Sequence, residues 1–249
     1  PPGYPLLTGK ALVPHVPGAA LFPRKLHALE QASDHIAPQS FIIRDEATGR
    51  AFMRPLATKA RTGVQVRLLC ARCGSTQAVF TGLFLRYRRT PNFEIAGWTQ
   101  VSPLKRQYQV NLRNHRKAMI VDGQHAFLGG INIHHENTTR PKGSAIRDYH
   151  FEVAGPVVQE VQYAFMKDWY YMTNENPETL LRDVYFPSIK TRGDALARLV
   201  CSGPTAHLQT IADVFFTAIV RARKQLLIVT PYFVPPYDIL RALRSAAIR

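Results

Sequence analysis

A histidine and a lysine two positions apart, His115 and Lys117, are the residues whose types and spacing best suit chemistry on a phosphate group. The segment after them is apolar and ends at Asp122-Gly123, a dipeptide typical of hairpin turns. We therefore predict a strand over 115–121 that pairs with an antiparallel strand over 126–128. Side chains two apart on a strand share a face, so an imidazole and an ammonium group would stand side by side. Such a pair can attack or protonate a phosphoester while neutralising its oxygens.

Small and neutral polar residues follow the predicted hairpin. Gly129 and Gly130 remove side chains where backbone amides could approach a phosphate, and Asn132 adds a neutral donor close by. A lone histidine is more often a surface or structural residue than a catalytic one. The alternative interpretation of His115 is therefore structural, and only the full spacing of the segment argues against it.

That spacing is His-x-Lys-x4-Asp, followed by six residues and Gly-Gly-x-Asn, and it resembles the phospholipase D superfamily. The resemblance extends from about Leu21 to Arg249, and within the superfamily the segments look most like bacterial cardiolipin synthases. The segments that carry it are Asn-Leu-Arg-Asn-His-Arg-Lys at 111–117, Gly-Gly-Ile-Asn-Ile at 129–133, Trp169-Tyr170 after Gly155-Pro156, His35-Ile36 followed by Phe-Ile-Ile-Arg-Asp-Glu at 41–46, and Thr-Pro-Tyr-Phe-Val at 230–234.

The resemblance implies a two-histidine mechanism. Members of this family pair two such motifs at one site on a pseudo-twofold axis, without a metal or any other cofactor. One histidine attacks the phosphodiester of a phosphatidyl lipid to give a phosphohistidine, and the other acts as general acid and then as base. By this resemblance His115 is the nucleophile or its acid/base partner, Lys117 and Asn132 hold phosphate oxygens, and Asp122 supports the motif's local structure.

A neutral, attacking imidazole needs an acceptor on its other nitrogen. Family members supply a carboxylate downstream of the Gly-x-x-Asn turn, which implies Asp148 here, with Glu136 in reserve. Asp148 could instead only form a salt bridge, for example with Arg147. Two further histidines, His134 and His135, would point apart on a strand, so we interpret them as loop residues near the site rather than as metal ligands.

Charge and cysteine content limit the partners and the compartment. The 249 residues include 32 Lys and Arg against 17 Asp and Glu, a net charge of +15, which should attract a membrane surface or nucleic acid. Three cysteines favour a reducing compartment, and Cys70 and Cys73 are interpreted as two partly buried thiols rather than a metal site. No run approaches 18 apolar residues, so the sequence predicts no membrane-spanning helix.

Helical and strand patterns alternate along the chain, which predicts an α/β fold: a phospholipase D-like layered sheet with helices on both faces. We expect an extended arm over 1–20, a first domain over 21–190, and the truncated beginning of a second, duplicated domain over 191–249. The elements expected are helices over 21–36, 49–62 (with Pro55 near its first turn), 210–224 and 237–249, and strands over 40–43, 64–69, 196–200 and 225–230.

The sequence also departs from the family's pattern. No second His-x-Lys-x4-Asp motif occurs, so a complete site needs a second half from a missing C-terminal region or from another subunit. Gln39-Ser40 replaces a Glu-Tyr common in cardiolipin synthases, Ala71 replaces an acidic residue, and Pro38 and Pro55 are unusual inside such elements.

Three functions stay open. The first is phosphatidyl transfer on phosphatidylglycerol at a bacterial cytoplasmic membrane, to which this chain would bind peripherally. The second is a single-motif, homodimeric nuclease, for which the net charge of +15 would suit a DNA backbone. Against it stands the start of a second repeat at 196–249, which a one-motif chain would not need, so nucleic acid is the less expected partner. The third is a degenerate, non-catalytic lipid-binding copy.

Overall fold

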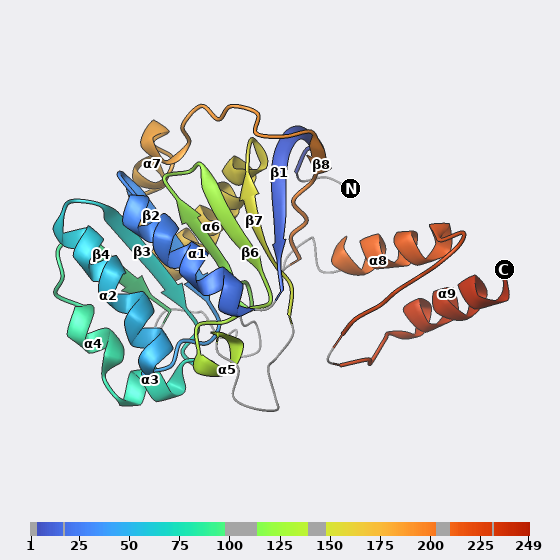
Figure 1. The fold of residues 1–249 in the computed structure, drawn as a ribbon, viewed down its shortest axis with the longest axis horizontal. Helices are drawn as coiled ribbons and strands as arrows, with labels where there is room; N and C mark the ends of the chain where they lie inside the picture. The colour runs from blue at the N-terminus through green and yellow to red at the C-terminus, as the bar shows by residue number, and fades with distance from the viewer. Residues whose placement is uncertain (1–3, 17, 98–113, 139–147, 203–209, 231) are drawn as a thin grey trace. The chain divides into compact units, whose positions relative to one another are not determined.

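The computed structural model describes residues 4–16, 18–97, 114–138, 148–202, 210–230 and 232–249. The chain divides into two compact units (Figure 1). The larger, here called the sheet unit, spans Pro5–Leu199, and the smaller, here called the helical unit, comprises Val200–Arg249 with the first four residues.

The sheet unit is built on one eight-stranded sheet. Its strands lie in the order β4 (Phe93–Ala96), β3 (Gln65–Cys70), β2 (His35–Ser40), β5 (Ala118–Val121), β6 (His125–Gly129), β7 (His150–Ala154), β1 (Leu7–His15) and β8 (Ala195–Ala197). The first three strands are parallel, and every other neighbouring pair is antiparallel.

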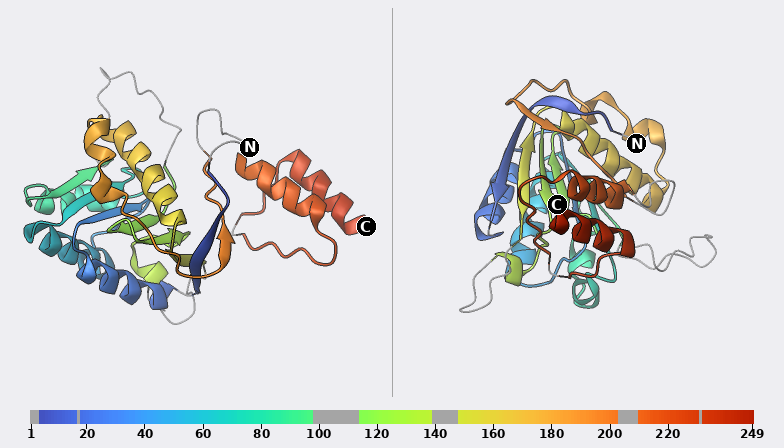
Figure 2. Two further views of the ribbon diagram at one scale, coloured as in Figure 1. Left: turned by 90° about the horizontal axis from the view of Figure 1, so that it is seen from above. Right: turned by 90° about the vertical axis from the view of Figure 1, so that its right-hand side faces the viewer.

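Helices cover both faces of this sheet, as Figure 2 shows. The long helices α1 (Gly18–Gln31) and α2 (Ala47–Arg61) lie on one face, and α6 (Val157–Thr173) lies on the other. Side chains alternate along the strands, so neighbours enter different apolar clusters: Met119 packs with α1 and α2, whereas Ile120 packs with α6. The predicted α/β fold with helices on both faces is confirmed.

Shorter elements complete the unit. They are α3 (Thr76–Phe80), α4 (Leu83–Tyr87), α5 (His135–Thr138), α7 (Pro177–Leu180) and the 3-10 turn η1 (Asp183–Tyr185).

The predictions for the first helices and strands are partly right. Strand β3 and helix α2 are confirmed, but Pro55 lies in the middle of α2 rather than in its first turn. Helix α1 ends at Gln31 and the following strand occupies His35–Ser40, so the predicted strand over 40–43 is wrong. Pro38 hid this strand, because proline is rare in central strands, yet here it pairs with Met119 in the middle of the sheet.

The segment interpreted as an extended arm, 1–20, contains β1 and the beginning of α1. Strand β1 pairs with β7 on one side and with β8 on the other, so its residues belong to the sheet. The sheet unit continues to Leu199 and includes β8, which lies beyond the expected boundary at residue 191.

The helical unit contains two amphipathic helices, α8 (Thr210–Arg221) and α9 (Tyr237–Ile248), which run side by side in the same direction (Figure 1) and confirm the two predicted helices. The Arg249 guanidinium donates to the Val220 carbonyl at the end of α8 (2.9 Å) and ties the two helices together. The strand predicted over 225–230 is not formed, and Leu227 and Val229 are 79% and 86% exposed. A strand needs a partner, and the described residues of this unit contain no other strand. Among the described residues no helix is long and apolar enough to cross a membrane.

Acid should destabilise the fold through His35, the first residue of β2. Burial lowers its pKa from 6.5 to about 4, although nearby Asp122 acts in the opposite direction. Unfolded histidine binds a proton at higher pH than this folded one, so the unfolded state gains protons first. The stabilisation is therefore present above pH 6.5 and is lost as the pH falls toward 4, by a total on the order of 3 kcal/mol.

Urea unfolding between pH 7 and pH 4.5 measures this effect. The variant His35→Leu should show a clearly shallower dependence of the unfolding free energy on pH than the unmodified chain. Equal slopes for the two proteins would contradict the assignment.

Candidate active site

His115 lies at the edge of the sheet where β2 ends. Strands β2 and β5 are antiparallel and pair Gln39 with Ala118, so the residues just before β5 lie beside those just after β2. The ring of Phe41 is 4.6 Å from the His115 ring, and the Lys117 Nζ lies 5.2 Å from the centre of the same Phe41 ring. The two side chains therefore share one neighbour, although the regular strand begins only at Ala118.

The imidazole is exposed, whereas the ammonium group is buried. Lys117 is 6% exposed, and its Nζ donates to the His115 carbonyl oxygen at 2.6 Å. Burial, and then the positive charge of Lys117, lower the pKa of His115. A lowered pKa keeps the ring neutral near pH 7, which is the form that can attack phosphorus.

Lys117 should give the reaction an alkaline limit. Burial lowers the pKa of Lys117 to about 8, while the charge of Asp148 acts to raise it. Only the protonated form neutralises phosphate oxygens, so the rate should fall as the pH rises through about 8. The pH profile of kcat measures this limit. In Lys117→Arg, whose guanidinium stays protonated, the alkaline fall should move to higher pH, and an unmoved limb would contradict the assignment.

The residues on either side of His115 are held by one carboxylate, that of Asp168 on α6. Asn114 donates to it at 2.6 Å, and Arg116 donates to both of its oxygens at 2.6 Å. The Arg116 amide in turn donates to the Asn114 side chain at 3.1 Å. Gln39, which is 5% exposed, donates to Asp168 from β2 at 2.9 Å. The backbone that carries His115 is thereby tied to both the sheet and α6.

The next residue on α6, Trp169, anchors that helix in the core. Trp169 is fully buried, and its indole N–H donates to the Glu175 carboxylate at 2.7 Å. Glu175 is held in turn by Arg67 of β3 at 2.8 Å. Because Trp169 is locked in the core, the rotation of α6 about its axis is set, and with it the position of Asp168.

Asn132 lies beside the same edge of the sheet. Its side-chain oxygen accepts from the Ile42 backbone amide at 3.1 Å, and its backbone amide donates to the Asn137 side-chain oxygen at 3.3 Å. Since the oxygen faces the backbone, the side-chain nitrogen is the atom that could donate to a phosphate.

Asp122 lies at the other end of β5, away from His115. Its carboxylate accepts from the amides of Ser33, Asp34 and His35 at 2.8 to 2.9 Å and from the Ser33 hydroxyl at 3.1 Å. Burial raises the pKa of Asp122, but these hydrogen bonds outweigh it and lower the pKa overall. The geometry gives Asp122 the role of joining the hairpin turn to the start of β2.

Both glycines approach the start of β7 closely. The Gly129 amide donates to the Lys117 carbonyl at 3.2 Å, and the Gly130 amide donates to the Tyr149 carbonyl at 3.1 Å. Both amides are thus used within the sheet rather than turned toward a ligand. A Cβ on Gly130 would meet the Asp148 carboxylate at 2.2 Å, so Gly130 provides the space in which that carboxylate lies.

Alanine substitutions at the two glycines should differ in what they lower: activity at Gly130 and stability at Gly129. In Gly130→Ala the atoms nearest to the new methyl group all belong to the Asp148 side chain, so activity should fall about tenfold with a stability change within about 0.5 kcal/mol. In Gly129→Ala the methyl group meets the backbone of Tyr149 and His150, which should cost about 1 to 3 kcal/mol of stability. Thermal unfolding and kcat of the two variants measure the contrast, and a stability loss in Gly130→Ala that equals the loss in Gly129→Ala would contradict it.

The two carboxylates considered as partners of His115 lie in different surroundings. Asp148 lies against Gly130 and acts on the charge of Lys117. Glu136 is exposed and pairs with Arg44 at 3.3 Å. Among the described residues no hydrogen bond joins either carboxylate to the His115 ring. The choice of Asp148 stays a prediction that this arrangement favours over Glu136.

The other metal-ligating residue types are dispersed. His134 is buried, whereas its neighbour His135 is exposed and begins α5, so the interpretation of both as loop residues is wrong for His135. Cys70 is buried and Cys73 is exposed, which corrects the prediction that both thiols are partly buried. Within the described ranges no three such side chains converge on one point.

Comparison with known proteins decides the family. The model of the family described as "Cardiolipin synthase, PLD-like domain" matches residues 26–169. The chain belongs to this family. The matched range contains the predicted motif from His115 to Asn132 and also Asp168.

Two similar curated proteins are named as cardiolipin synthases. Cardiolipin synthase A of Pseudomonas entomophila is 36% identical over 235 residues, covering 94% of this chain and 48% of the relative. Cardiolipin synthase of Geobacillus kaustophilus is 35% identical over 223 residues, covering 88% of this chain and 43% of the relative. The chain thus spans about half the length of the curated relatives that it matches.

Among solved structures, the phosphatidylserine synthase of Haemophilus influenzae has a TM-score of 0.65 at 13% sequence identity. The match covers 97% of this chain and 60% of that protein, and it shows a shared fold.

One residue of this PLD-like domain escaped the sequence reasoning, namely Asp168. Trp169-Tyr170 was noted as part of the resemblance, but the carboxylate before it was not. The available signal was the pair of polar residues, Asn114 and Arg116, on either side of His115, which require an acceptor when they are half-buried.

Proposed function

We propose that this domain carries one half of a phosphatidyl-transfer site, with His115 as one of the two histidines that act on phosphorus. The single observation that supports it most is the exposed His115 imidazole beside the buried Lys117 ammonium, both against Phe41. Membership in the family and the names of the curated relatives support a phospholipid as the substrate.

The proposed reaction has two steps. In the first, the neutral His115 nitrogen forms a bond to phosphorus and the bond from phosphorus to the leaving alcohol breaks. A second histidine gives that alcohol its proton. In the second step the same histidine takes the proton of an incoming alcohol or water, whose oxygen attacks phosphorus as the bond to His115 breaks. With phosphatidylglycerol as both donor and acceptor, the products are cardiolipin and glycerol.

Three polar residues around His115 have a part in this scheme, namely Lys117, Asn132 and Asp148. Lys117 neutralises a phosphate oxygen throughout, and the Asn132 side-chain nitrogen donates to another. Asp148 is proposed to hold the second nitrogen of His115 so that the attacking nitrogen is unprotonated. The second histidine comes from residues outside this sequence, either further along the chain or on another subunit, because the sequence contains the motif once.

A second candidate is a homodimeric nuclease, which the net charge of +15 favours because a basic protein binds the DNA backbone. A third is a lipid-binding copy without turnover. Incubation with phosphatidylglycerol vesicles, and separately with plasmid DNA, distinguishes all three.

The chain should be tested alone and in a longer form that contains the second motif. Cardiolipin and glycerol from the longer form, together with a phosphohistidine at position 115 after an acid-free quench, are the expected result. Nicked plasmid without cardiolipin would replace the proposal with the nuclease, and binding of vesicles without any turnover would replace it with the lipid-binding copy.

A further inference from the structure

An exposed face of the sheet unit combines large apolar side chains with arginines. It is formed by α3, α4 and their flanking turns, residues 71–90, here called the α3–α4 surface. Phe80 is 81% exposed, more than any other large apolar side chain in the described part of the sheet unit, and Leu85 is 53% exposed. The segment contains four arginines and no acidic residue, the arginines being Arg72, Arg86, Arg88 and Arg89. Apolar side chains presented among cations are the features of an interfacial membrane contact.

The α3–α4 surface begins next to the candidate active site. Strand β3 is parallel to β2, so the turn that leads into α3 lies at the same edge of the sheet as His115. The Ser75 hydroxyl, just before α3, donates to the Phe41 carbonyl at 3.3 Å and accepts from the Ile43 amide at 3.0 Å. Phe41 is the residue whose ring contacts His115. A five-residue helix is only about 7 Å long, so Phe80 at the end of α3 stays near this edge.

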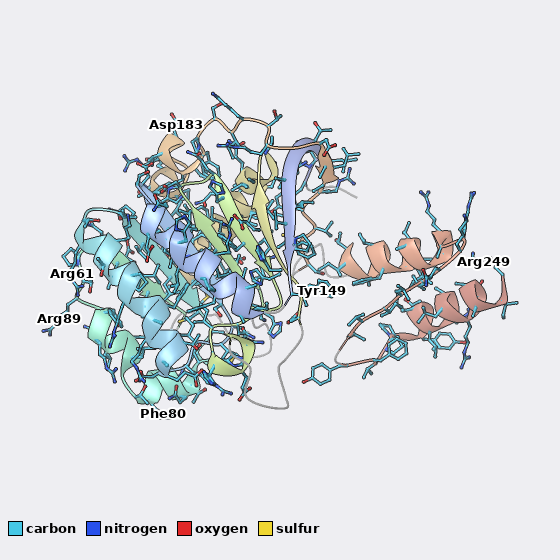
Figure 3. All side chains as sticks on the ribbon, in the orientation of Figure 1. Arg61, Phe80, Arg89, Tyr149, Asp183 and Arg249 are labelled. Atoms are coloured by element: carbon cyan, nitrogen blue, oxygen red, sulfur yellow. The ribbon has the colours of Figure 1, made fainter. Side chains whose placement is uncertain are left out.

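The side chains of this surface are presented outward. Phe80 and Arg89 project from the outer margin of the sheet unit in Figure 3. Arg86 is held at the start of α4 by Asp45 at 3.0 Å and by the Thr81 carbonyl at 3.2 Å. Arg88 and Arg89 are exposed, and neither forms an ion pair with any residue that the structure describes. Two cations that no described ion pair neutralises therefore follow the exposed Leu85 by three and four positions.

We propose that the α3–α4 surface docks on an anionic phospholipid bilayer, with Phe80 and Leu85 in the interface and Arg88 and Arg89 over the headgroups. A bilayer fits this surface better than a protein does, because its exposed apolar side chains lie in a segment with four arginines and no acidic residue, which suits anionic headgroups. Docking there would bring the edge of the sheet that carries His115 to the headgroup layer. The choice of an anionic lipid rests on the proposed function, whereas the surface itself does not.

Vesicle co-sedimentation tests the proposal, using phosphatidylglycerol–phosphatidylcholine vesicles and pure phosphatidylcholine vesicles. The double variants Phe80→Ser with Leu85→Ser, and Arg88→Gln with Arg89→Gln, should each bind the anionic vesicles about tenfold more weakly or worse. Matched controls lie at another edge of the unit: Leu181→Ser, which changes a side chain 51% exposed, and Lys190→Gln with Arg192→Gln, which removes the same charge. Both controls should bind within about twofold of the unmodified chain. Equal losses in the test and control variants would overturn the proposal.

Insertion of Phe80 can be measured directly. In Phe80→Trp the added indole fluorescence should be quenched by brominated acyl chains, whereas in Leu181→Trp it should not. Absence of quenching in Phe80→Trp would overturn the proposal.

Two further arms separate docking from catalysis. His115→Ala should bind vesicles as tightly as the unmodified chain, since His115 is not part of the surface. Vesicle binding through this surface without cardiolipin formation by any form of the protein would leave docking standing and remove the proposed function. Cardiolipin formation by the longer form, with undiminished vesicle binding in the surface variants, would leave the proposed function standing and remove docking through this surface.

Discussion

His115→Ala should abolish phosphatidyl transfer in a form of the protein that has both motifs, with a loss of at least about a thousandfold in kcat. The reason is that the two site residues beside it cannot take its place: Lys117 is buried with its Nζ on the His115 carbonyl, and the Asn132 side chain is an amide, which is not a nucleophile. Because the imidazole is exposed and its ring contact is with Phe41, the unfolding free energy should change by no more than about 0.5 kcal/mol.

Cardiolipin formation and urea unfolding measure the two parts of this prediction. His125→Ala is the matched control, because His125 is an exposed histidine of the same hairpin at the opposite end of β6 from Gly129. Its activity should stay within about twofold of the original. Substantial transfer in His115→Ala, or an equal loss in His125→Ala, would contradict the assignment of His115.

The motif hairpin could be predicted because its signals are local. Asp122 and Gly123 adopt φ values of 50° and 61°, and the Gln124 amide donates to the Val121 carbonyl at 3.0 Å, as a tight turn requires. The apolar residues before the turn and Ala126–Leu128 after it then pair in register. The turn and the pairing of its two strands follow from sequence neighbours, whereas the hydrogen bonds of Asp122 to residues 33–35 do not.

Strand β2 could not be predicted in the same way, because its burial depends on distant partners. Pro38 and Gln39 have poor strand propensity, yet β2 lies between β3 and β5 and is buried along its whole length. Gln39 is acceptable there only because Asp168, 129 residues later in the sequence, accepts its amide. The substitution of Gln39-Ser40 for Glu-Tyr, noted as a departure, thus has a hydrogen-bonding partner on α6.

The opposite error concerns residues 225–230. Their composition predicts a strand, and in the described helical unit they have no regular structure because no strand lies beside them. Local propensity was sufficient for α8 and α9, whose hydrogen bonds are internal, but insufficient for a strand, whose hydrogen bonds come from a neighbour. The duplication that this strand helped to suggest therefore stays a prediction.

Asp168→Ala should reduce kcat about ten- to a hundredfold, although Asp168 touches no reacting atom. Asp168 is a positioning residue, because its carboxylate holds Asn114 and Arg116 on either side of His115 at 2.6 Å. Without it the segment that carries His115 loses its connection to α6, and the imidazole spends less time aligned with phosphorus. KM should change little, because the phosphate contacts proposed for Lys117 and Asn132 do not involve Asp168.

Asp168→Ala should also lower the stability of the fold, so its unfolding free energy must be measured together with its activity. Removing the carboxylate leaves the buried Gln39 amide without its acceptor, which should cost about 1 to 3 kcal/mol of unfolding free energy. Activity must therefore be measured below the temperature at which the variant begins to unfold. Asp183→Ala, at an exposed carboxylate in η1, is the control and should leave both kcat and stability unchanged.

The decisive comparison is with Asp168→Asn, which keeps an oxygen to accept from Arg116 but offers an N–H group to donors that need an acceptor. Its kcat should fall between those of Asp168→Ala and the unmodified protein. The His115 ring signal in NMR should broaden or shift in both variants, because the backbone around it becomes less constrained, and should not change in Asp183→Ala. An unaltered His115 signal, together with a raised KM and an unchanged kcat, would mean that Asp168 stabilises the fold without positioning the histidine. The carboxylate beside Trp169 would then have no part in the reaction.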